Sequence, residues 1–160
     1  MIHIYYGYGK GKTSAALGLA LRACGARKKV DFFSFLKDNS SSERFAKCDI
    51  NFFKNPDEVK FLFNMSEEEK KEYCDFLFST VEKAFSSNAD IIVLDEFLDV
   101  ISLLGEKYVE EISFSPDKEY VITGHIKNDF LFDKADYITE MRKEKHPFDS
   151  GVAARRGIEY

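Results

Sequence analysis

A glycine-rich turn between two structured segments near the amino end constrains the fold of this chain more than any other feature. Residues 2–6 form a short apolar, β-branched and aromatic run (IHIYY) that predicts a buried strand and stops at the turn GYGKGK. The Ala- and Leu-rich segment after it predicts a helix from about Lys12 to Cys24, ended by Gly25. Strand, glycine turn and helix in this order are the setting of a phosphate-binding loop.

The residues of this turn have the chemistry that binds a polyphosphate. Glycines let backbone N–H groups surround an anion, and the following helix adds the positive end of its dipole. Lys12 would supply charge for the outer phosphates, and the Thr13 hydroxyl would ligate Mg²⁺. The usual pattern has a glycine where this chain has Tyr6, and a lysine-rich surface turn is the plainer alternative. The predicted nucleotide contacts of the loop and first helical turn are Gly7, Tyr8, Gly9, Lys10, Gly11, Lys12, Thr13 and Ser14.

A second apolar run, IIVL at 91–94, ends in Asp95 and Glu96. Ligands of open α/β sheets bind at the carboxyl ends of the strands, so either acid could complete the Mg²⁺ shell with Thr13. Glu96 could instead be a general base that activates water, and the pattern alone does not separate the two roles. Residues 35–38 (FLKD) begin with a phenylalanine where guanine recognition needs an asparagine, which favours ATP over GTP.

Predicted strands alternate with predicted helices along the rest of the 160 residues. This alternation predicts one domain over residues 1–160, a three-layer α/β fold of the P-loop NTPase-like (RecA-like) class with a largely parallel sheet. Ser66 and Glu69 predict a capping box at the start of one helix. The further strands are expected at 30–36, 49–53, 119–123 and 136–141, and the further helices at 66–85, 97–104 and 106–112.

Composition excludes several classes of protein. A net charge of −5 is not that of a dedicated nucleic-acid binder, and no apolar run approaches the roughly 20 residues that span a bilayer. The amino end lacks the features of a signal peptide. The three cysteines, Cys24, Cys48 and Cys74, contain no CxxC pair and predict free buried thiols in a reducing cytoplasm.

Taken together, these segments resemble the P-loop corrinoid adenosyltransferases, the ATP:cob(I)alamin adenosyltransferase family. The opening GYGKGKTSAALGLALRACG is similar to that of the family, whose loop also lacks the usual first glycine. IIVLDE and the later VITG follow the family order. The carboxyl end, ADYITEMRKEKHPFDSGVAARRGIEY, is the most diagnostic stretch, since no general phosphate-loop chemistry requires it.

The resemblance implies transfer of the 5′-deoxyadenosyl group of ATP to the Co(I) of a reduced corrinoid, with release of triphosphate, in adenosylcobalamin synthesis or salvage. ATP and the corrinoid would be the substrates and Mg²⁺ the cofactor, and a reductant such as a flavoprotein would supply Co(I). The loop and Lys12 would hold the leaving triphosphate, and Glu96 would be a metal ligand rather than a base. Members of this family are often homodimers.

The resemblance also suggests roles for four residues outside the loop. Phe61 and Phe63 match a pair that removes the axial ligand below cobalt, although two core phenylalanines are an equally good interpretation. Arg22 matches a family arginine near the nucleotide, or it simply complements the dipole of its helix. His125 is a candidate nucleotide contact at a position where the family usually has arginine, but an imidazole is mostly neutral at pH 7 and cannot fork onto an anion.

Two other functions stay open at this point. One is a small P-loop ATPase or kinase of other specificity, and the other is a nucleotide- or corrinoid-binding relative without catalysis. Residues 37–64 are shorter than the family leads us to expect, so the preferred corrinoid is not predicted.

Overall fold

A computed structural model of the chain describes residues 1–60 and 64–160. Within these residues, strands and helices alternate as the apolar segments predicted. The strands are β1 (Ile2–Tyr6), β2 (Val30–Ser34), β3 (Ile50–Phe52), β4 (Ile91–Asp95), β5 (Glu119–Gly124) and β6 (Tyr137–Glu140). The helices are α1 (Lys12–Gly25), α2 (Glu67–Ser86), α3 (Phe97–Leu104), α4 (Glu106–Glu110) and α5 (Asp129–Lys134), with 3-10 helices η1 (Ser42–Phe45) and η3 (Pro147–Ser150).

The strands form one sheet in the order β3-β2-β4-β5-β1-β6, and every neighbouring pair is parallel. Parallel neighbours cannot be joined by a tight turn, so the connections cross the faces of the sheet. Because all the strands run the same way, their carboxyl ends lie at one edge. The predicted α/β class with a parallel sheet is therefore confirmed, and it is consistent with a P-loop NTPase-like domain.

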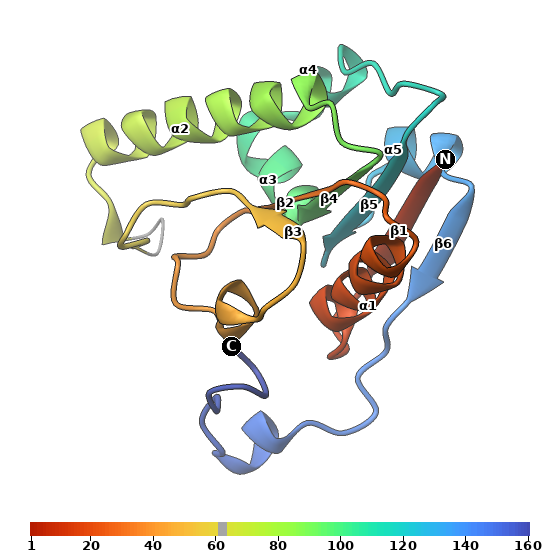
Figure 1. The fold of residues 1–160 in the computed structure, drawn as a ribbon. Helices are drawn as coiled ribbons and strands as arrows, with labels where there is room; N and C mark the ends of the chain where they lie inside the picture. The colour runs from red at the N-terminus through yellow and green to blue at the C-terminus, as the bar shows by residue number, and fades with distance from the viewer. Residues whose placement is uncertain (61–63) are drawn as a thin grey trace.

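Helices cover both faces of the sheet (Figure 1). On one face α1 packs through Ala16, Ala20 and Ala23, whose small side chains let the helix backbone lie close to Phe32 and Val93. The larger cluster lies on the other face, where α2 and α3 bury apolar side chains against the same strands. Every residue of β4 is buried, as expected for a strand that has helices on both sides.

Local signals explain most of the helix boundaries. Ser66 accepts a hydrogen bond from the Glu69 amide, and the Glu69 carboxylate accepts one from the Ser66 amide, so the predicted capping box of α2 is confirmed. The residues of α3 are those expected. The predicted strand 30–36 was too long, because β2 ends at Ser34 and Leu36 adopts a left-handed φ of 56° that no strand contains.

The prediction of buried thiols was wrong in degree. Cys24, Cys48 and Cys74 are unpaired as expected, but each is only partly buried.

The predicted short helix at 106–112 ends two residues early, at Glu110. Across residues 1–60 and 64–160, the helices are all too short or too polar to cross a bilayer.

Candidate functional site

The chemically active side chains of this fold come from the carboxyl ends of four neighbouring strands. The glycine loop follows β1, Lys37 follows β2, Asp95 and Glu96 stand at the end of β4, and Thr123 lies at the end of β5. Sheet order alone brings these segments together, although they are far apart in sequence. This edge of the sheet is where open α/β folds bind ligands.

Two glycines of the loop are required by a close approach of the chain after β6. The Gly9 amide donates a hydrogen bond to the Met141 carbonyl at 2.7 Å. A Cβ on Gly9 would lie 2.6 Å from the Met141 carbonyl carbon and 2.7 Å from that of Arg142, and one on Gly7 would lie 2.6 Å from the Met141 oxygen. Gly11 has a φ of 116° and stands directly before α1. The backbone contacts of the loop with residues 141–142 thus leave no space for a side chain at Gly7 or Gly9.

Lys12 is turned toward the backbone of its own loop. Its Nζ donates hydrogen bonds to the Gly7 carbonyl at 2.7 Å and the Gly9 carbonyl at 3.3 Å. Burial lowers the pKa of Lys12, and the nearby carboxylates of Glu96 and Asp99 oppose that effect. Among residues 1–60 and 64–160, the hydrogen-bond partners of this buried ammonium are both neutral carbonyl groups, which suits it to an anionic ligand.

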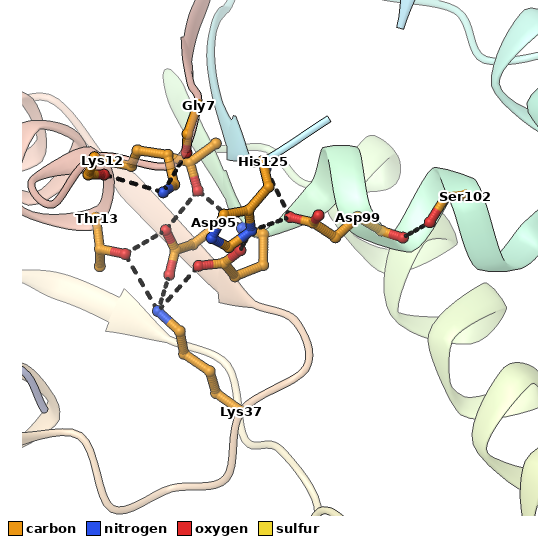
Figure 2. Close-up of polar contacts among 11 residues, drawn as sticks. Gly7, Lys12, Thr13, Lys37, Asp95, Asp99, Ser102 and His125 are labelled. Atoms are coloured by element: carbon orange, nitrogen blue, oxygen red, sulfur yellow. Dashed lines mark hydrogen bonds and ion pairs between the residues drawn. The ribbon is translucent and has the colours of Figure 1, made fainter. Parts of the chain in front are cut away.

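Asp95 is the centre of the polar network in Figure 2, and its side chain is fully buried. Its Oδ1 accepts hydrogen bonds from the hydroxyls of Thr13 at 2.9 Å and Thr123 at 2.7 Å. Its Oδ2 accepts one from the Lys37 ammonium at 2.6 Å. The same ammonium lies 3.2 Å from the Thr13 hydroxyl oxygen and 3.9 Å from a carboxylate oxygen of Glu96.

Glu96, Asp99 and His125 form a second group beside this network. Burial and the neighbouring Asp95 raise the pKa of Glu96 to about 7. His125 Nδ1 lies 3.1 Å from Asp99 Oδ2 and 3.5 Å from Glu96 Oε2, and its hydrogen bond with Asp99 raises its pKa. Ligand atoms of the three side chains lie within 4.8 Å of one another. The raised pKa values mean that Glu96 and His125 each hold a proton more tightly than the free side chains do.

The donor set around Asp95 fits a magnesium ion. Mg²⁺ prefers oxygen ligands and is held by few carboxylates together with phosphate oxygens. Thr13 and Asp95 provide a hydroxyl and a carboxylate in direct contact, with a Glu96 oxygen close by. The Lys37 ammonium already places one positive charge among these oxygens. The cation that these oxygens contact in the structure is therefore the Lys37 ammonium.

Two cavities adjoin these residues. The larger, about 950 Å³, is lined by Thr13, Ser14, Lys37, by part of the segment 38–43, and by the last four residues 157–160. The smaller, about 230 Å³, lies over the glycine loop. They share walls at the start of α1, at the Glu96 group and at the carboxyl end. The cavity over the glycine loop and the larger cavity are thus adjacent.

The predicted site residues do not all reach this region. Tyr8, Lys10 and Ser14 line the smaller cavity, as does His125. Arg22 is exposed in the last turn of α1, at the opposite end of that helix from the loop, and the structure does not bring it to the other site residues. Phe61 and Phe63 lie outside the described residues, so their role stays a prediction from the resemblance.

Sequence reasoning missed three residues of the network: Lys37, Asp99 and Thr123. Thr123 stands at the carboxyl end of an apolar strand, as Asp95 does, and Lys37 stands three residues after the end of another. Asp99 lies in the first turn of α3, three residues after Glu96, which directly precedes the helix. These patterns are present in the sequence, but they identify site residues only when the order of the strands in the sheet is known.

A parallel sheet whose first strand leads through a glycine-lysine loop into a helix, with a threonine and an aspartate paired beside it, defines a nucleotide-binding protein of the P-loop class. Comparison with known families narrows this class. Over residues 1–160 the chain matches the family described as ATP:corrinoid adenosyltransferase BtuR/CobO/CobP. The chain belongs to that family, which confirms the resemblance stated above.

Individual relatives agree with the family. The chain is 31% identical to the corrinoid adenosyltransferase of Escherichia coli (strain K12) over 174 residues, which cover 100% of this chain and 85% of the relative. It is 30% identical to corrinoid adenosyltransferase CobA of Salmonella typhimurium over the same shares of both chains. The corrinoid adenosyltransferase of Pseudomonas aeruginosa is 28% identical over 98% of this chain and 82% of its own length.

Proposed function

We propose that this chain transfers the 5′-deoxyadenosyl group of ATP to the cobalt of a reduced corrinoid and releases triphosphate. Membership of the corrinoid adenosyltransferase family over the whole chain supports this reaction class. The structural observation that carries the proposal is the pairing of Thr13 with Asp95 beside a cavity of about 950 Å³. Phosphate-binding chemistry therefore adjoins space for a second, bulky substrate.

In this reaction the electron pair of Co(I) attacks C5′ of the ribose, and the bond from C5′ to the α-phosphate oxygen breaks. The bonding electrons leave with triphosphate, so no proton has to be removed from the nucleophile. Catalysis then consists of orienting C5′ toward cobalt and stabilising charge on the leaving group. The Lys12 ammonium, the amides of the loop and the amino end of α1 supply that stabilisation.

We also propose Mg²⁺ as the cofactor, with Thr13 and Asp95 as ligands and Glu96 as the next oxygen donor. Bound with the nucleotide, it supplies positive charge to the leaving triphosphate. The ion-pair contact of Glu96 with His125, and the hydrogen bond of Asp99 with the same ring, favour a role for Glu96 in holding charge near the metal rather than in activating water. His125 would then orient this acidic pair instead of contacting phosphate.

Three further parts of the proposal rest on the family resemblance. A flavoprotein or similar reductant would supply Co(I), and two copies of the chain would form a homodimer. Phe61 and Phe63 would displace the axial ligand of the cobalt. The three unpaired cysteines support the cytoplasm as the compartment, because a reducing medium keeps thiols free.

An anaerobic assay tests the proposal. The chain is incubated with Mg-ATP and chemically generated cob(I)alamin, and the Co(I) absorption is followed with time. We expect enzyme-dependent loss of that absorption and formation of a light-sensitive alkylcobalamin. A chain that binds Mg-ATP but leaves the Co(I) spectrum unchanged would contradict the proposed function.

A further inference from the structure

Lys37 places a positive charge among the oxygens of Thr13, Asp95 and Glu96, where the proposed metal ion would bind. Its Nζ lies 2.6 Å from Asp95 Oδ2, 3.2 Å from the Thr13 hydroxyl oxygen and 3.9 Å from Glu96 Oε1. These three side chains are the ones whose oxygens suit magnesium. Figure 2 shows the lysine extended from its loop toward Thr13 and Asp95.

The backbone on both sides of this contact is held in an unusual conformation. Leu36, directly before Lys37, has a φ of 56°, and Glu96 has a φ of 66°. Side-chain-bearing residues rarely adopt this region, and they cluster at binding and switch sites when they do. Leu36 and Glu96 follow the adjacent strands β2 and β4, whose last paired residues are Ser34 and Asp95. The strained backbone therefore directs Lys37 and Glu96 to the same point.

The charges around Lys37 explain why a cation is needed there. Asp95 is fully buried, and within residues 1–60 and 64–160 the partner of its Oδ2 is the Lys37 ammonium. Glu96 is the next residue and would repel Asp95 if both were charged without a cation between them. A lysine, unlike a fixed structural group, can leave this position, because its flexible stem carries a compact charge.

We infer that Lys37 is a tethered cation that occupies the metal position in the nucleotide-free chain and moves onto the triphosphate when magnesium nucleotide binds. The inference rests on the proposed use of a magnesium nucleotide. An ammonium and a metal ion cannot both contact the same oxygens, because two positive charges at that separation repel strongly. The Lys37 side chain is 28% exposed and lines the cavity of about 950 Å³. That cavity shares Thr13 and Ser14 with the cavity over the glycine loop, so the released ammonium lies beside the space for the triphosphate.

Binding of Mn²⁺ to the nucleotide-free chain tests the first half of this inference. Free Mn²⁺ is measured by electron paramagnetic resonance with wild type, Lys37→Met, Lys37→Arg and the control Lys54→Met, an exposed lysine paired with Asp57. We expect Lys37→Met to bind Mn²⁺ about tenfold more tightly than wild type, because its acidic ligands lose their competing cation. Lys37→Arg and Lys54→Met should bind as weakly as wild type. Equal Mn²⁺ affinity in Lys37→Met and wild type would overturn the inference.

A crystal structure of the wild-type chain with Mg²⁺ and the β,γ-imido analogue of ATP tests the second half without any variant. We expect the Lys37 Nζ beyond hydrogen-bond distance of Asp95 and within it of a phosphate oxygen. A Lys37 that still bridges Thr13 and Asp95, with the metal elsewhere, would overturn the inference. Neither experiment measures adenosyl transfer. If the inference about Lys37 failed, the cob(I)alamin assay could still show adenosyl transfer. If the proposed function failed, the movement of Lys37 from Asp95 to a phosphate oxygen could still be observed.

Discussion

The Thr13 hydroxyl donates a hydrogen bond to Asp95 Oδ1 at 2.9 Å, although the two residues are 82 positions apart in sequence. Each belongs to a short pattern that is common in unrelated proteins. Their contact joins the glycine loop after β1 to the acidic end of β4, and it requires the strand order that places both at one edge. The pairing of two weak signals is what makes a nucleotide site specific here.

Lys12→Ala should abolish adenosyl transfer. The substitution removes the one ammonium of the loop that is buried against its backbone carbonyls, and we expect turnover to fall by about 10² or more. Loss of the Co(I) absorption under anaerobic conditions measures it. Lys28→Ala, at an exposed position after α1, is the control and should keep wild-type turnover. Wild-type turnover by Lys12→Ala would remove the loop lysine from the mechanism.

Gly9→Ala and Gly18→Ala should change stability in opposite directions. A methyl group on Gly9 would meet backbone carbons of Met141 and Arg142 at 2.6 and 2.7 Å, so we expect a loss of about 2 kcal/mol in the free energy of unfolding. Gly18 lies inside α1, where an added Cβ would meet no atom within 4 Å, and alanine there should add about 0.5–1 kcal/mol to the free energy of unfolding. Urea denaturation measures both. A stabilising Gly9→Ala would show that the approach after β6 is not fixed.

The free energy of unfolding should fall as the pH rises from 5 to 8 in the nucleotide-free chain. Burial and Asp95 raise the pKa of Glu96 from 4.5 to about 7, so in that range the folded chain holds a proton that the unfolded chain has lost. His125 acts in the same direction, since its raised pKa means that a stabilising proton is lost as the pH rises.

Glu96→Gln should flatten this pH dependence. At pH 8 its free energy of unfolding should exceed that of wild type by about 1 kcal/mol or more, so it should unfold at a higher urea concentration. Glu72→Gln, an exposed position on α2, serves as the control and should leave the curve unchanged. Urea titrations at pH 5, 6.5 and 8 measure both variants. If Glu96→Gln followed the wild-type curve, Glu96 would not hold the proton.

Glu159→Ala should bind Mg-ATP more tightly than wild type. The Glu159 carboxylate accepts a hydrogen bond from Lys10 at 3.1 Å and lines both cavities, so it competes with phosphate for a loop cation. Hydrogen bonds from Arg155 hold its pKa near 2, and it is therefore charged at any working pH. We expect the Kd for Mg-ATP to fall by about twofold to fivefold in isothermal titration calorimetry.

Asp149→Ala is the matched control for that experiment. Asp149 is an acid of the same carboxyl-terminal segment, paired with Lys143 at 2.9 Å and outside both cavities. Its removal should leave the affinity for Mg-ATP unchanged. Weaker binding by Glu159→Ala would mean that the carboxyl end supports the nucleotide instead of competing with it.

The sequence predicted the features that depend on local chemistry. The loop between β1 and α1, the capping box of Ser66 and Glu69, and the acidic end of β4 are each written within a few neighbouring residues. Physical rules for helix starts, buried strands and anion-binding turns act over the same short distances. The strand segments themselves then constrained the sheet to be parallel, because helices separate them.

Features that depend on strand order or on an unusual backbone could not be predicted in this way. Lys37 joins the site only because β2 lies beside β4 and because Leu36 takes a left-handed φ, which a leucine rarely adopts. The carboxyl end folds back, and the Ser42 hydroxyl donates a hydrogen bond to the Tyr160 backbone oxygen at 2.9 Å, across 118 positions of the sequence. No periodicity in the sequence specifies either arrangement.

The identity of the phosphorus product tests the central claim most directly. After anaerobic reaction of the chain with Mg-ATP and cob(I)alamin, phosphorus NMR separates tripolyphosphate from ADP and orthophosphate. The proposed attack at C5′ predicts one tripolyphosphate for each alkylcobalamin formed, and none when Lys12→Ala replaces the wild type. ADP as the main product would place the reaction at phosphorus and contradict the account.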